Sequence, residues 1–247
     1  MAKHIAMAGK GGTGKTTVAA LLIKYLIEKK KGAILAVDAD PNANLNEALG
    51  YEVENTISQI LVDIKKGDVP TSMTKETYLQ FELHRALVET DHVDLLVMGG
   101  PQGPGCYCFP TDILKRHLAN MDRSYDYLVI DNEAGLEHIS RKTIEDVDVM
   151  LVISDPTAKG VRTAGRIYQL AKSLNINIAD AYLIVTRITD PAPLQKEIDA
   201  TGLKLLGVIP HDPKVVEHDL KGIAMLDLPD DSAAVLATRD MFDKLKL

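Results

Sequence analysis

The segment GKGGTGKTT, residues 9–17, combines the residue types that bind the phosphate groups of a nucleotide. Its glycines allow backbone N–H groups to converge on phosphate oxygens, and the helix expected after it presents its positive end to the anion. Lys15 can reach the β- and γ-phosphates, and the Thr16 hydroxyl can ligate Mg²⁺. We therefore predict that a nucleotide is contacted by Gly9, Lys10, Gly11, Gly12, Thr13, Gly14, Lys15, Thr16 and Thr17.

Aspartates lie at the ends of two apolar segments, in VDADPNANL at 37–45 and in YDYLVIDNE at 125–133. Acidic residues at the carboxyl edge of a parallel sheet lie where such sheets bind ligands. Asp131 can hold Mg²⁺ through the water shell of the metal, which neutralises charge on the β- and γ-oxygens during hydrolysis. For Asp38 and Asp40 a second interpretation stays open, in which their carboxylates cap the next helix.

The two cysteines of the chain, Cys106 and Cys108, stand one residue apart in GPGCYCFP. Taken alone, they are a metal site, a redox pair or two small buried residues. A disulfide across one residue would close a strained ring. Two thiolates cannot complete a metal shell, but two chains related by a two-fold axis supply four. His117, on an expected helix, is the one histidine near them that we consider as a further ligand.

Short apolar runs alternate with amphipathic stretches along the whole chain. Because the runs are continuously apolar, they suit strands covered by helices on both faces. The alternation predicts an α/β fold with a doubly wound, mainly parallel sheet of seven to eight strands. The expected strands are 4–8, 33–37, 93–98, 125–130, 147–153, 181–186 and 205–209, the main expected helices are 16–31, 160–174 and 231–245, and residues 52–90 form a mostly helical excursion.

Composition narrows the class of protein. The 247 residues carry a formal net charge of −7, which argues against a protein that binds nucleic acid over a broad basic surface. No apolar stretch has the length of a signal or membrane segment, so we expect a cytoplasmic protein that binds neither membrane nor nucleic acid. The chain shows no repeat and no clear linker, and we expect one domain over residues 1–247.

Lys10 is a lysine additional to Lys15, directly after the first glycine of GKGGTGKTT, and it makes this segment resemble the deviant Walker A motif of the ParA/MinD/nitrogenase-iron-protein class of P-loop ATPases. The resemblance covers nearly the whole chain and implies a slow, Mg²⁺-dependent ATPase that forms a homodimer around ATP. It implies that Lys10 acts on the phosphates of the other subunit, as an arginine finger does. It further implies that Asp40 orients the attacking water, which makes Lys10, Lys15 and Asp40 the catalytic residues, and that Asp38 lies near the Mg²⁺ through water.

The segment EAGLEH, residues 133–138, resembles the CooC-type ATPases, which assist nickel insertion into carbon monoxide dehydrogenase, and their relatives serving acetyl-CoA synthase. Taken independently, Glu133, Glu137 and His138 could form a metal cluster, but we prefer the interpretation in which they belong to a loop that responds to the γ-phosphate. The chain departs from the class after the sixth strand, where Thr186-Arg187 replaces an asparagine that reads adenine. A threonine lacks the paired donor and acceptor of an amide, so we expect base contacts from Arg187, Pro210 and His211.

The resemblance implies that Cys106 and Cys108 of two subunits bind Ni²⁺, with Zn²⁺ as a possible substitute. The chain would then be an ATP-driven metallochaperone whose client partner is carbon monoxide dehydrogenase or acetyl-CoA synthase. The sequence does not distinguish between these two clients. Two alternatives remain: a ParA/MinD-like ATPase for spatial organisation that binds DNA or membrane, and an electron-transfer ATPase with an iron–sulfur cluster.

Overall fold

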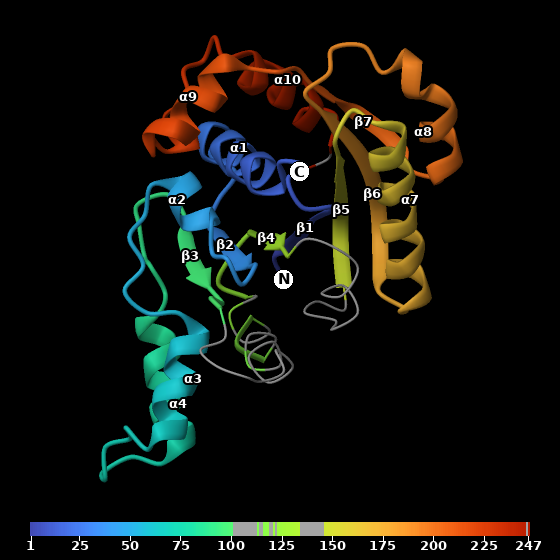
Figure 1. Ribbon diagram of the computed structural model, residues 1–247. Helices are drawn as coiled ribbons and strands as arrows, with labels where there is room; N and C mark the ends of the chain where they lie inside the picture. Colours follow the sequence, from blue (N-terminus) through green and yellow to red (C-terminus); the bar gives the residue numbers. More distant parts are fainter. Residues whose placement is uncertain (101–112, 114–115, 119–120, 122, 134–145, 246) are drawn as a thin grey trace.

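The strands of the protein form one parallel sheet with β1 at its centre (Figure 1). The computed structural model describes residues 1–100, 113, 116–118, 121, 123–133, 146–245 and 247. Within this part, the seven-stranded sheet has the order β3-β2-β4-β1-β5-β6-β7, which confirms the doubly wound α/β fold. The strands are β1 (Lys3–Gly9), β2 (Ile34–Ala39), β3 (Asp94–Val97), β4 (Tyr127–Asn132), β5 (Asp146–Ser154), β6 (Asn177–Thr186) and β7 (Lys204–Ile209).

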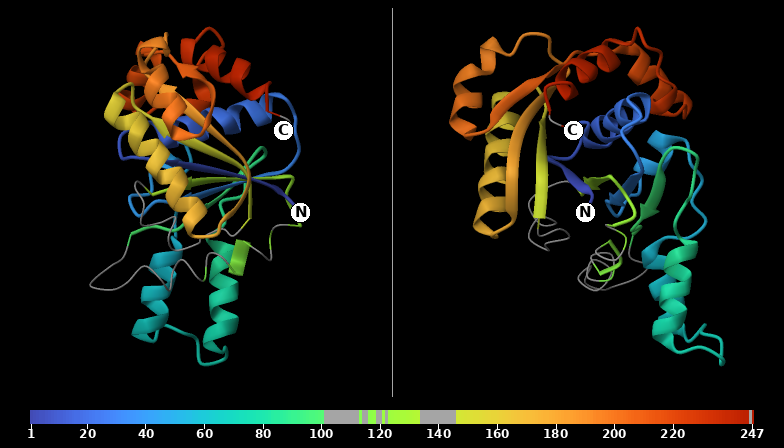
Figure 2. Two further views of the ribbon diagram at one scale, coloured as in Figure 1. Left: turned by 90° about the vertical axis from the view of Figure 1, so that its right-hand side faces the viewer. Right: turned by 180° about the vertical axis from the view of Figure 1, so that it is seen from behind.

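In the described part of the chain, helices lie between β1 and β2, β2 and β3, β5 and β6, and β6 and β7 and after β7, and they cover both faces of the sheet (Figure 2). Successive residues of a strand point to opposite faces, so each central strand supplies two cores. In β1, Ile5 and Met7 pack with α1 and α10, whereas Ala6 and Ala8 pack with α7 and α8 on the other face. The helices are α1 (Lys15–Glu28), α2 (Leu45–Leu49), α3 (Ile57–Lys66), α4 (Lys75–Arg85), α7 (Ala158–Ser173), α8 (Gln195–Thr201), α9 (Pro213–Lys221) and α10 (Ala233–Phe242), with 3₁₀ turns η1 (Ala192–Leu194) and η2 (Met225–Asp227).

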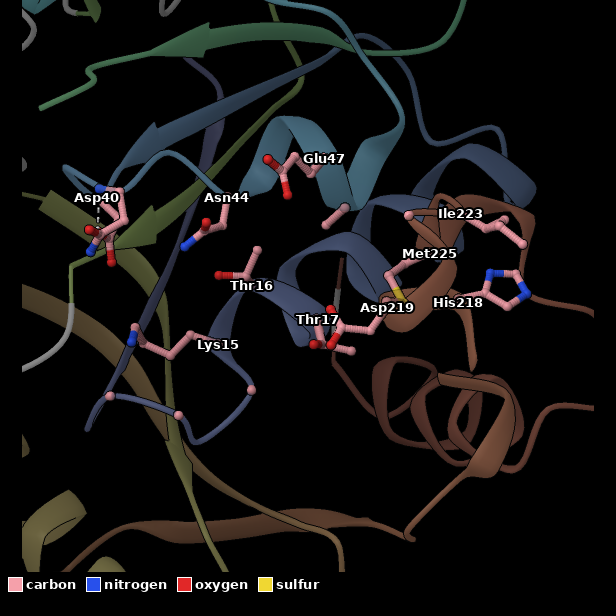
Figure 3. A pocket seen from close by; sticks show the side chains of 16 residues that line it. Lys15, Thr16, Thr17, Asp40, Asn44, Glu47, His218, Asp219, Ile223 and Met225 are labelled. Carbon is pink, nitrogen blue, oxygen red and sulfur yellow. Dashed lines mark hydrogen bonds between the residues drawn. The ribbon is translucent and has the colours of Figure 1, made fainter. Parts of the chain in front are cut away.

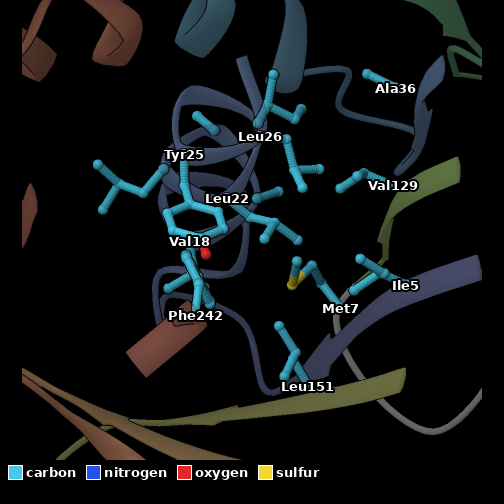
Figure 4. Close-up of a cluster of buried hydrophobic side chains, with 14 of the residues drawn as sticks. Ile5, Met7, Val18, Leu22, Tyr25, Leu26, Ala36, Val129, Leu151 and Phe242 are labelled. Atoms are coloured by element: carbon cyan, nitrogen blue, oxygen red, sulfur yellow. The ribbon is translucent and has the colours of Figure 1, made fainter. Parts of the chain in front are cut away.

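Among the described helices, α1 has the largest share of buried residues, and it fixes the loop that precedes it. Its residues Leu22 and Leu26 are fully buried in the core cluster that also contains Ile5 and Met7 of β1 (Figure 4). On its other side, Tyr25 meets Phe242 of α10 edge-on, with the ring centroids 5.5 Å apart. Such an aromatic pair adds about 0.5–1.5 kcal/mol to the area it buries. A well-packed α1 therefore holds the β1–α1 loop at a fixed place on the sheet edge.

The end of α1 differs from the sequence-based prediction. The apolar pattern and Gly32 predict a helix to residue 31, but α1 ends at Glu28 and the lysines at 29–31 follow it. The chain turns there through Lys30, whose φ is 50°, and through Gly32, whose φ is 114°. The Asp126 carboxylate then accepts a hydrogen bond from the Ala33 N–H at 2.8 Å. The turn into β2, rather than helix propensity, sets the end of α1.

The expected excursion at residues 52–90 contains α3 and α4, which follow β2 and α2 and precede β3 (Figure 1). Threonine caps begin both helices: the Thr56 hydroxyl accepts a hydrogen bond from Gln59 N–H, and the Thr74 hydroxyl accepts one from Thr77 N–H. Each cap satisfies a backbone donor that the first helical turn leaves unpaired. Ile57 of α3 is buried against the face of β2 that α1 does not cover.

The strand order reverses at β1, which pairs with β4 on one side and β5 on the other. At such a switch point, the connections leave the carboxyl edge in opposite directions and open a crevice where α/β sheets bind ligands. The segment 9–17 begins at this edge. The fold therefore puts the predicted phosphate-binding loop where the topology provides room for a ligand.

Candidate nucleotide site

Two glycines of the β1–α1 loop occupy positions that other residues would not tolerate. A Cβ atom on Gly9 would lie 2.4 Å from the backbone oxygen of Ile153 in the neighbouring strand β5. Gly14 caps α1 with a φ of 92°, in the left-handed region that glycine adopts without strain. The loop thus passes tightly over the sheet edge and delivers the N-terminal end of α1 to the crevice, where its free N–H groups favour an anion.

The loop is held from its far side by the last residue of β6, Thr186, and by the next residue, Arg187. The Thr186 hydroxyl lies 2.9 Å from the Thr13 backbone oxygen and 3.2 Å from the Ser154 backbone oxygen. The guanidinium of Arg187 donates to the Gly12 backbone oxygen at 3.0 Å. Inside the loop, the Thr13 hydroxyl donates to the Lys10 backbone oxygen at 2.8 Å. These contacts shape the loop without using the backbone N–H groups that would bind phosphate.

Thr16 and Asp131 meet across the crevice. The Thr16 hydroxyl donates to Oδ2 of Asp131 at 2.5 Å, and Asp131 is only 1% exposed. The other carboxylate oxygen, Oδ1, is buried and has no hydrogen-bond partner among the described residues. Burial raises the pKa of the Asp131 carboxyl to about 6, although the Thr16 hydrogen bond and the charge of Lys15 lower it. A hydroxyl and a buried carboxylate with an open acceptor fit Mg²⁺, which prefers oxygen ligands and keeps several waters.

The two lysines of the loop differ in their surroundings. Lys15 is buried, with 6% of its surface exposed, while Lys10 is exposed at the start of the loop. Burial lowers the pKa of the Lys15 ammonium, while the charges of Asp131, Asp40 and Glu133 act against that shift. The two side chains therefore differ in burial: Lys15 is enclosed by its own chain, and Lys10 is exposed to solvent.

Asp38 and Asp40, both at the end of β2, also have different roles in the structure. Asp38 is fully buried, and its two carboxylate oxygens accept hydrogen bonds from the backbone N–H groups of Asp40 and Leu45, at 3.0 and 2.8 Å. Burial raises the pKa of the Asp38 carboxyl to about 7, against the lowering effect of these two bonds. Each oxygen thus accepts one backbone hydrogen bond, and the bond from Leu45 at the start of α2 agrees with the capping interpretation, while the expected contact with magnesium water stays a prediction. Asp40 is partly exposed and accepts from the backbone and side-chain N–H groups of Asn42, both at 2.9 Å.

A cleft of about 410 Å³ lies above the loop (Figure 3). Lys15 and Asp40 lie at one end of it, Thr16 lies in the middle, and His218 lies at the other end. The sequence interpretation missed several lining residues from α2 and α9 and their flanks, because a polar residue on a short helix carries no motif. These additional polar residues are Asn42, Asn44, Glu47, His218 and Asp219.

A second hollow of about 570 Å³ adjoins the first along Gly12, Gly14 and Thr17. Its wall includes Arg187, Pro210 and His211, which are the residues expected to contact the base. Thr186 also lines it, but the hydroxyl of Thr186 is already engaged by the two backbone oxygens described above. The residue that replaces the asparagine of the class thus serves the phosphate-binding loop, and Arg187, Pro210 and His211 remain as candidates to face a base.

Several expected site residues lie outside the described residues: Cys106, Cys108, Glu137 and His138. Within the described part of the chain, no three His, Cys, Asp or Glu side chains gather in a way that could hold a metal ion. His117 is buried beside His84 of α4, with the ring centroids 5.7 Å apart, and its Nε2 has no hydrogen-bond partner in that part of the chain. Among the described helices, none combines the length and apolar character needed to cross a membrane.

The fold and the loop agree with a family of nucleotide-binding proteins. Residues 4–225 match the CobQ/CobB/MinD/ParA nucleotide binding domain, and the chain belongs to this family. An uncharacterized ATP-binding protein of Methanocaldococcus jannaschii is 42% identical, over 98% of this chain and 97% of its own length. The carbon monoxide dehydrogenase accessory protein CooC of Rhodospirillum rubrum is 32% identical, over 91% of this chain and 89% of its own length.

A solved structure of the septum site-determining protein MinD from Pyrococcus horikoshii, complexed with Mg-ADP, superimposes with a TM-score of 0.74. It is 25% identical and covers 100% of this chain, with 96% of its own length matched. The comparison supports a P-loop protein of the MinD/ParA type, in agreement with the sheet order and the position of the β1–α1 loop.

Proposed function

We propose that this protein is a Mg²⁺-dependent ATPase whose site is the cleft above the β1–α1 loop. The observation that carries the proposal is the contact of Thr16 with Asp131, which leaves one buried carboxylate oxygen open beside the buried Lys15. A buried unpaired acceptor is costly, so its retention next to a phosphate-binding loop favours a ligand there. The similarity to an ATP-binding protein of Methanocaldococcus jannaschii favours ATP as the nucleotide.

In this proposal each residue of the cleft has a separate role in the transfer of the γ-phosphoryl group to water. The loop N–H groups and Lys15 bind the β- and γ-phosphates, and Asp40 orients a water molecule toward the γ-phosphorus. The water oxygen forms a bond to that phosphorus as the bond to the β–γ bridging oxygen breaks, which yields ADP and phosphate. Thr16 and Asp131 would hold Mg²⁺, which neutralises charge on the phosphate oxygens. The exposed Lys10 would stabilise the transferring group in a second copy of the chain.

The ATPase proposal is tested by phosphate release with purified protein and ATP, with and without Mg²⁺. We expect slow hydrolysis that needs Mg²⁺ and that falls at least about a hundredfold in Asp131→Asn, because the amide cannot replace the metal-binding carboxylate. Hydrolysis that survives in EDTA, or in Asp131→Asn at the wild-type rate, would contradict the proposed site.

We further propose that the ATPase delivers nickel to carbon monoxide dehydrogenase or acetyl-CoA synthase. The support is the 32% identity to a carbon monoxide dehydrogenase accessory protein and the Cys-x-Cys pair at residues 106 and 108. The chain leaves β3 toward these cysteines at the carboxyl edge, where Val97 pairs with Asp38. Two thiolates from each of two copies would together supply the four ligands of one metal site.

Equilibrium dialysis with Ni²⁺ tests the cargo. We expect one Ni²⁺ per two chains, and loss of that binding in Cys106→Ser and in Cys108→Ser, since each variant removes two of four thiolates from the dimer. A competition series with Zn²⁺ separates the native metal from a substitute. Nickel retained at full stoichiometry by the single variants would place the metal elsewhere.

Similarity to MinD proteins favours a second candidate function, spatial organisation by binding to DNA or membrane. The Bacillus subtilis septum site-determining protein MinD is 28% identical over 92% of this chain and 83% of its own length. Binding to duplex DNA or to anionic vesicles that needs ATP and weakens with salt would favour this function over metal delivery. An iron–sulfur electron-transfer role would instead show as a visible absorbance band after anaerobic purification.

A further inference from the structure

Asp38 is a buried carboxylate that the proposed reaction does not use directly, and it joins the two ends of the segment after β2. One oxygen accepts the N–H of Asp40 at 3.0 Å and the other accepts the N–H of Leu45 at 2.8 Å. Leu45 is itself fully buried and begins α2. The backbone of Asp38 makes a third hydrogen bond, in which its carbonyl oxygen accepts from the Met98 N–H at 2.9 Å. One residue thus connects β2, the start of α2 and the end of β3.

The segment held in this way contains Asp40, the residue proposed to orient the attacking water. The Asp40 carboxylate is fixed in turn by Asn42, whose backbone and side-chain N–H groups both donate to the same oxygen at 2.9 Å. The direction of the Asp40 side chain therefore depends on the path of residues 40–44. That path is anchored at both ends by the Asp38 carboxylate.

Comparison with Asp131 separates two roles for neighbouring carboxylates. Asp38 and Asp131 are partners in the register of β2 and β4, so they leave adjacent strands at the same level. Asp131 keeps one oxygen without a partner among the described residues, whereas both oxygens of Asp38 accept backbone hydrogen bonds. A ligand or its water shell would find on Asp131 an oxygen with no hydrogen bond among the described residues, whereas each oxygen of Asp38 already accepts one from the backbone.

We propose that Asp38 is a positioning residue for ATP hydrolysis, which sets the orientation of Asp40 by tying the backbone at Asp40 and Leu45. This inference rests on the proposed function, because it assumes hydrolysis in this cleft. Asp38 then affects the rate of the chemical step and has little effect on nucleotide binding, since Lys15 and the β1–α1 loop bind the phosphates independently of this segment.

Asp38→Asn is the informative substitution, because the amide has the size of the carboxylate but presents an N–H group to one of the two backbone donors. We expect kcat to fall by about tenfold to a hundredfold, as displacement of a catalytic group by about 1 Å does. We expect KM and the affinity for Mg·ADP to change less than about threefold, because the substitution leaves intact the contacts that bind the nucleotide equally in the ground state and the transition state. Asp38→Glu keeps both acceptor oxygens but displaces them, and it replaces Asp38→Asn if that variant does not fold.

Asp94→Asn is the matched control. The Asp94 carboxylate also accepts two hydrogen bonds, one from the backbone N–H of Thr90 and one from the side-chain hydroxyl of Tyr125. It lies at the opposite end of the same strand pair, opposite Leu35. We expect this variant to lower the melting temperature while kcat stays at the wild-type value.

Three results separate the possibilities. A fall in kcat with binding retained in the Asp38 variant, and not in Asp94→Asn, supports the inference. An unchanged kcat, or a loss of Mg·ADP affinity with kcat intact, overturns it and returns Asp38 to a structural or metal-binding role. Wild-type protein without Mg²⁺-dependent hydrolysis overturns the proposed function and this inference with it, and phosphate release by the wild type is therefore measured first.

Discussion

The hydroxyl of Thr16 and the carboxylate of Asp131 lie 2.5 Å apart, although 115 positions separate them in the sequence. The contact exists because β1 and β4 are neighbours in the sheet, with Met7 opposite Asp131, so that the first turn of α1 lies beside the end of β4. It joins the loop that would bind phosphate to the carboxylate that would hold the metal. A change at either residue should therefore affect the response to Mg²⁺.

Substitution of Thr16 should remove the effect of Mg²⁺ on nucleotide binding. We expect Thr16→Ala to weaken Mg·ADP binding by about tenfold or more, since a hydrogen bond to a charged group contributes about 1.5–3 kcal/mol. Thr16→Ser keeps the hydroxyl and should bind like the wild type. Isothermal titration with and without Mg²⁺ measures the difference, and an alanine variant that still gains affinity from Mg²⁺ would exclude Thr16 as a ligand.

The two lysines of the loop should separate binding from catalysis. Lys15 is buried in the cleft, so Lys15→Gln should lose nucleotide affinity by about a hundredfold, as expected for a desolvated charge contact to phosphate. Lys10 is exposed, and Lys10→Gln should retain affinity in the monomer while hydrolysis falls by about a hundredfold or more. Fluorescence titration with a labelled nucleotide and phosphate release report the two effects. Equal losses of affinity in both variants would argue against a role of Lys10 in a second subunit.

The Thr186 hydroxyl should stabilise the folded loop. Thr186→Val leaves the backbone oxygens of Thr13 and Ser154 without this donor in a buried place, and we expect the free energy of unfolding to fall by about 1–3 kcal/mol. Thr163→Val is a suitable control, because its hydroxyl also donates to a backbone oxygen, that of Lys159, but at an exposed position. Urea unfolding measures both. Equal and small effects would mean that the Thr186 contact does not hold the loop.

The stability of the protein should depend on pH through His117. Burial, together with the nearby His84, lowers the pKa of His117 from its ordinary value of 6.5. The unfolded chain then binds the proton more readily than the folded chain, so stability is complete above pH 6.5 and decreases as the pH falls through that value. Urea midpoints between pH 8 and pH 5 should show this decrease, and His117→Phe should flatten it.

The exposed partner of His117 provides a control for that experiment. His84→Ala removes the neighbouring charge but leaves His117 buried, so the decrease in stability toward low pH should become smaller without disappearing. A wild-type profile that is flat between pH 8 and pH 5, or identical profiles for the wild type and His117→Phe, would contradict a buried neutral histidine.

The sequence predicts the sheet well because its signals are local. Each continuous apolar run, such as 147–153, forms a strand covered on both faces, and the loop at residues 9–17 lies between the strand and helix that its motif requires. The helix ends are less predictable, since the turn at Lys30 depends on the entry into β2 and on Asp126 from a distant strand. A local pattern cannot contain that information.

For the candidate site, too, the sequence predicts what local motifs specify and misses contacts that depend on distant parts of the chain or on the backbone. Lys15, Thr16 and Asp131 come together as their motifs predict. The use of the Thr186 hydroxyl does not follow from sequence, because its partner Thr13 lies 173 positions away and contributes a backbone oxygen rather than a side chain. Asp38 has partners only two and seven positions away, but they too are backbone groups, and the turn that presents them has no signature of its own. Contacts to the main chain are the part of a site that residue types do not reveal.

A mixing experiment tests most directly the claim that ATP is hydrolysed in a site shared by two copies of the chain. Lys10→Ala and Asp40→Asn should each be inactive alone, because one lacks the group given to the partner and the other lacks the group that orients water. In a mixed dimer, one of the two sites has its own Asp40 and receives Lys10 from the other chain. An equal mixture should therefore recover about a quarter of the wild-type phosphate release, since half of the random dimers are mixed and each has one complete site. A mixture no more active than either variant alone would contradict the shared site.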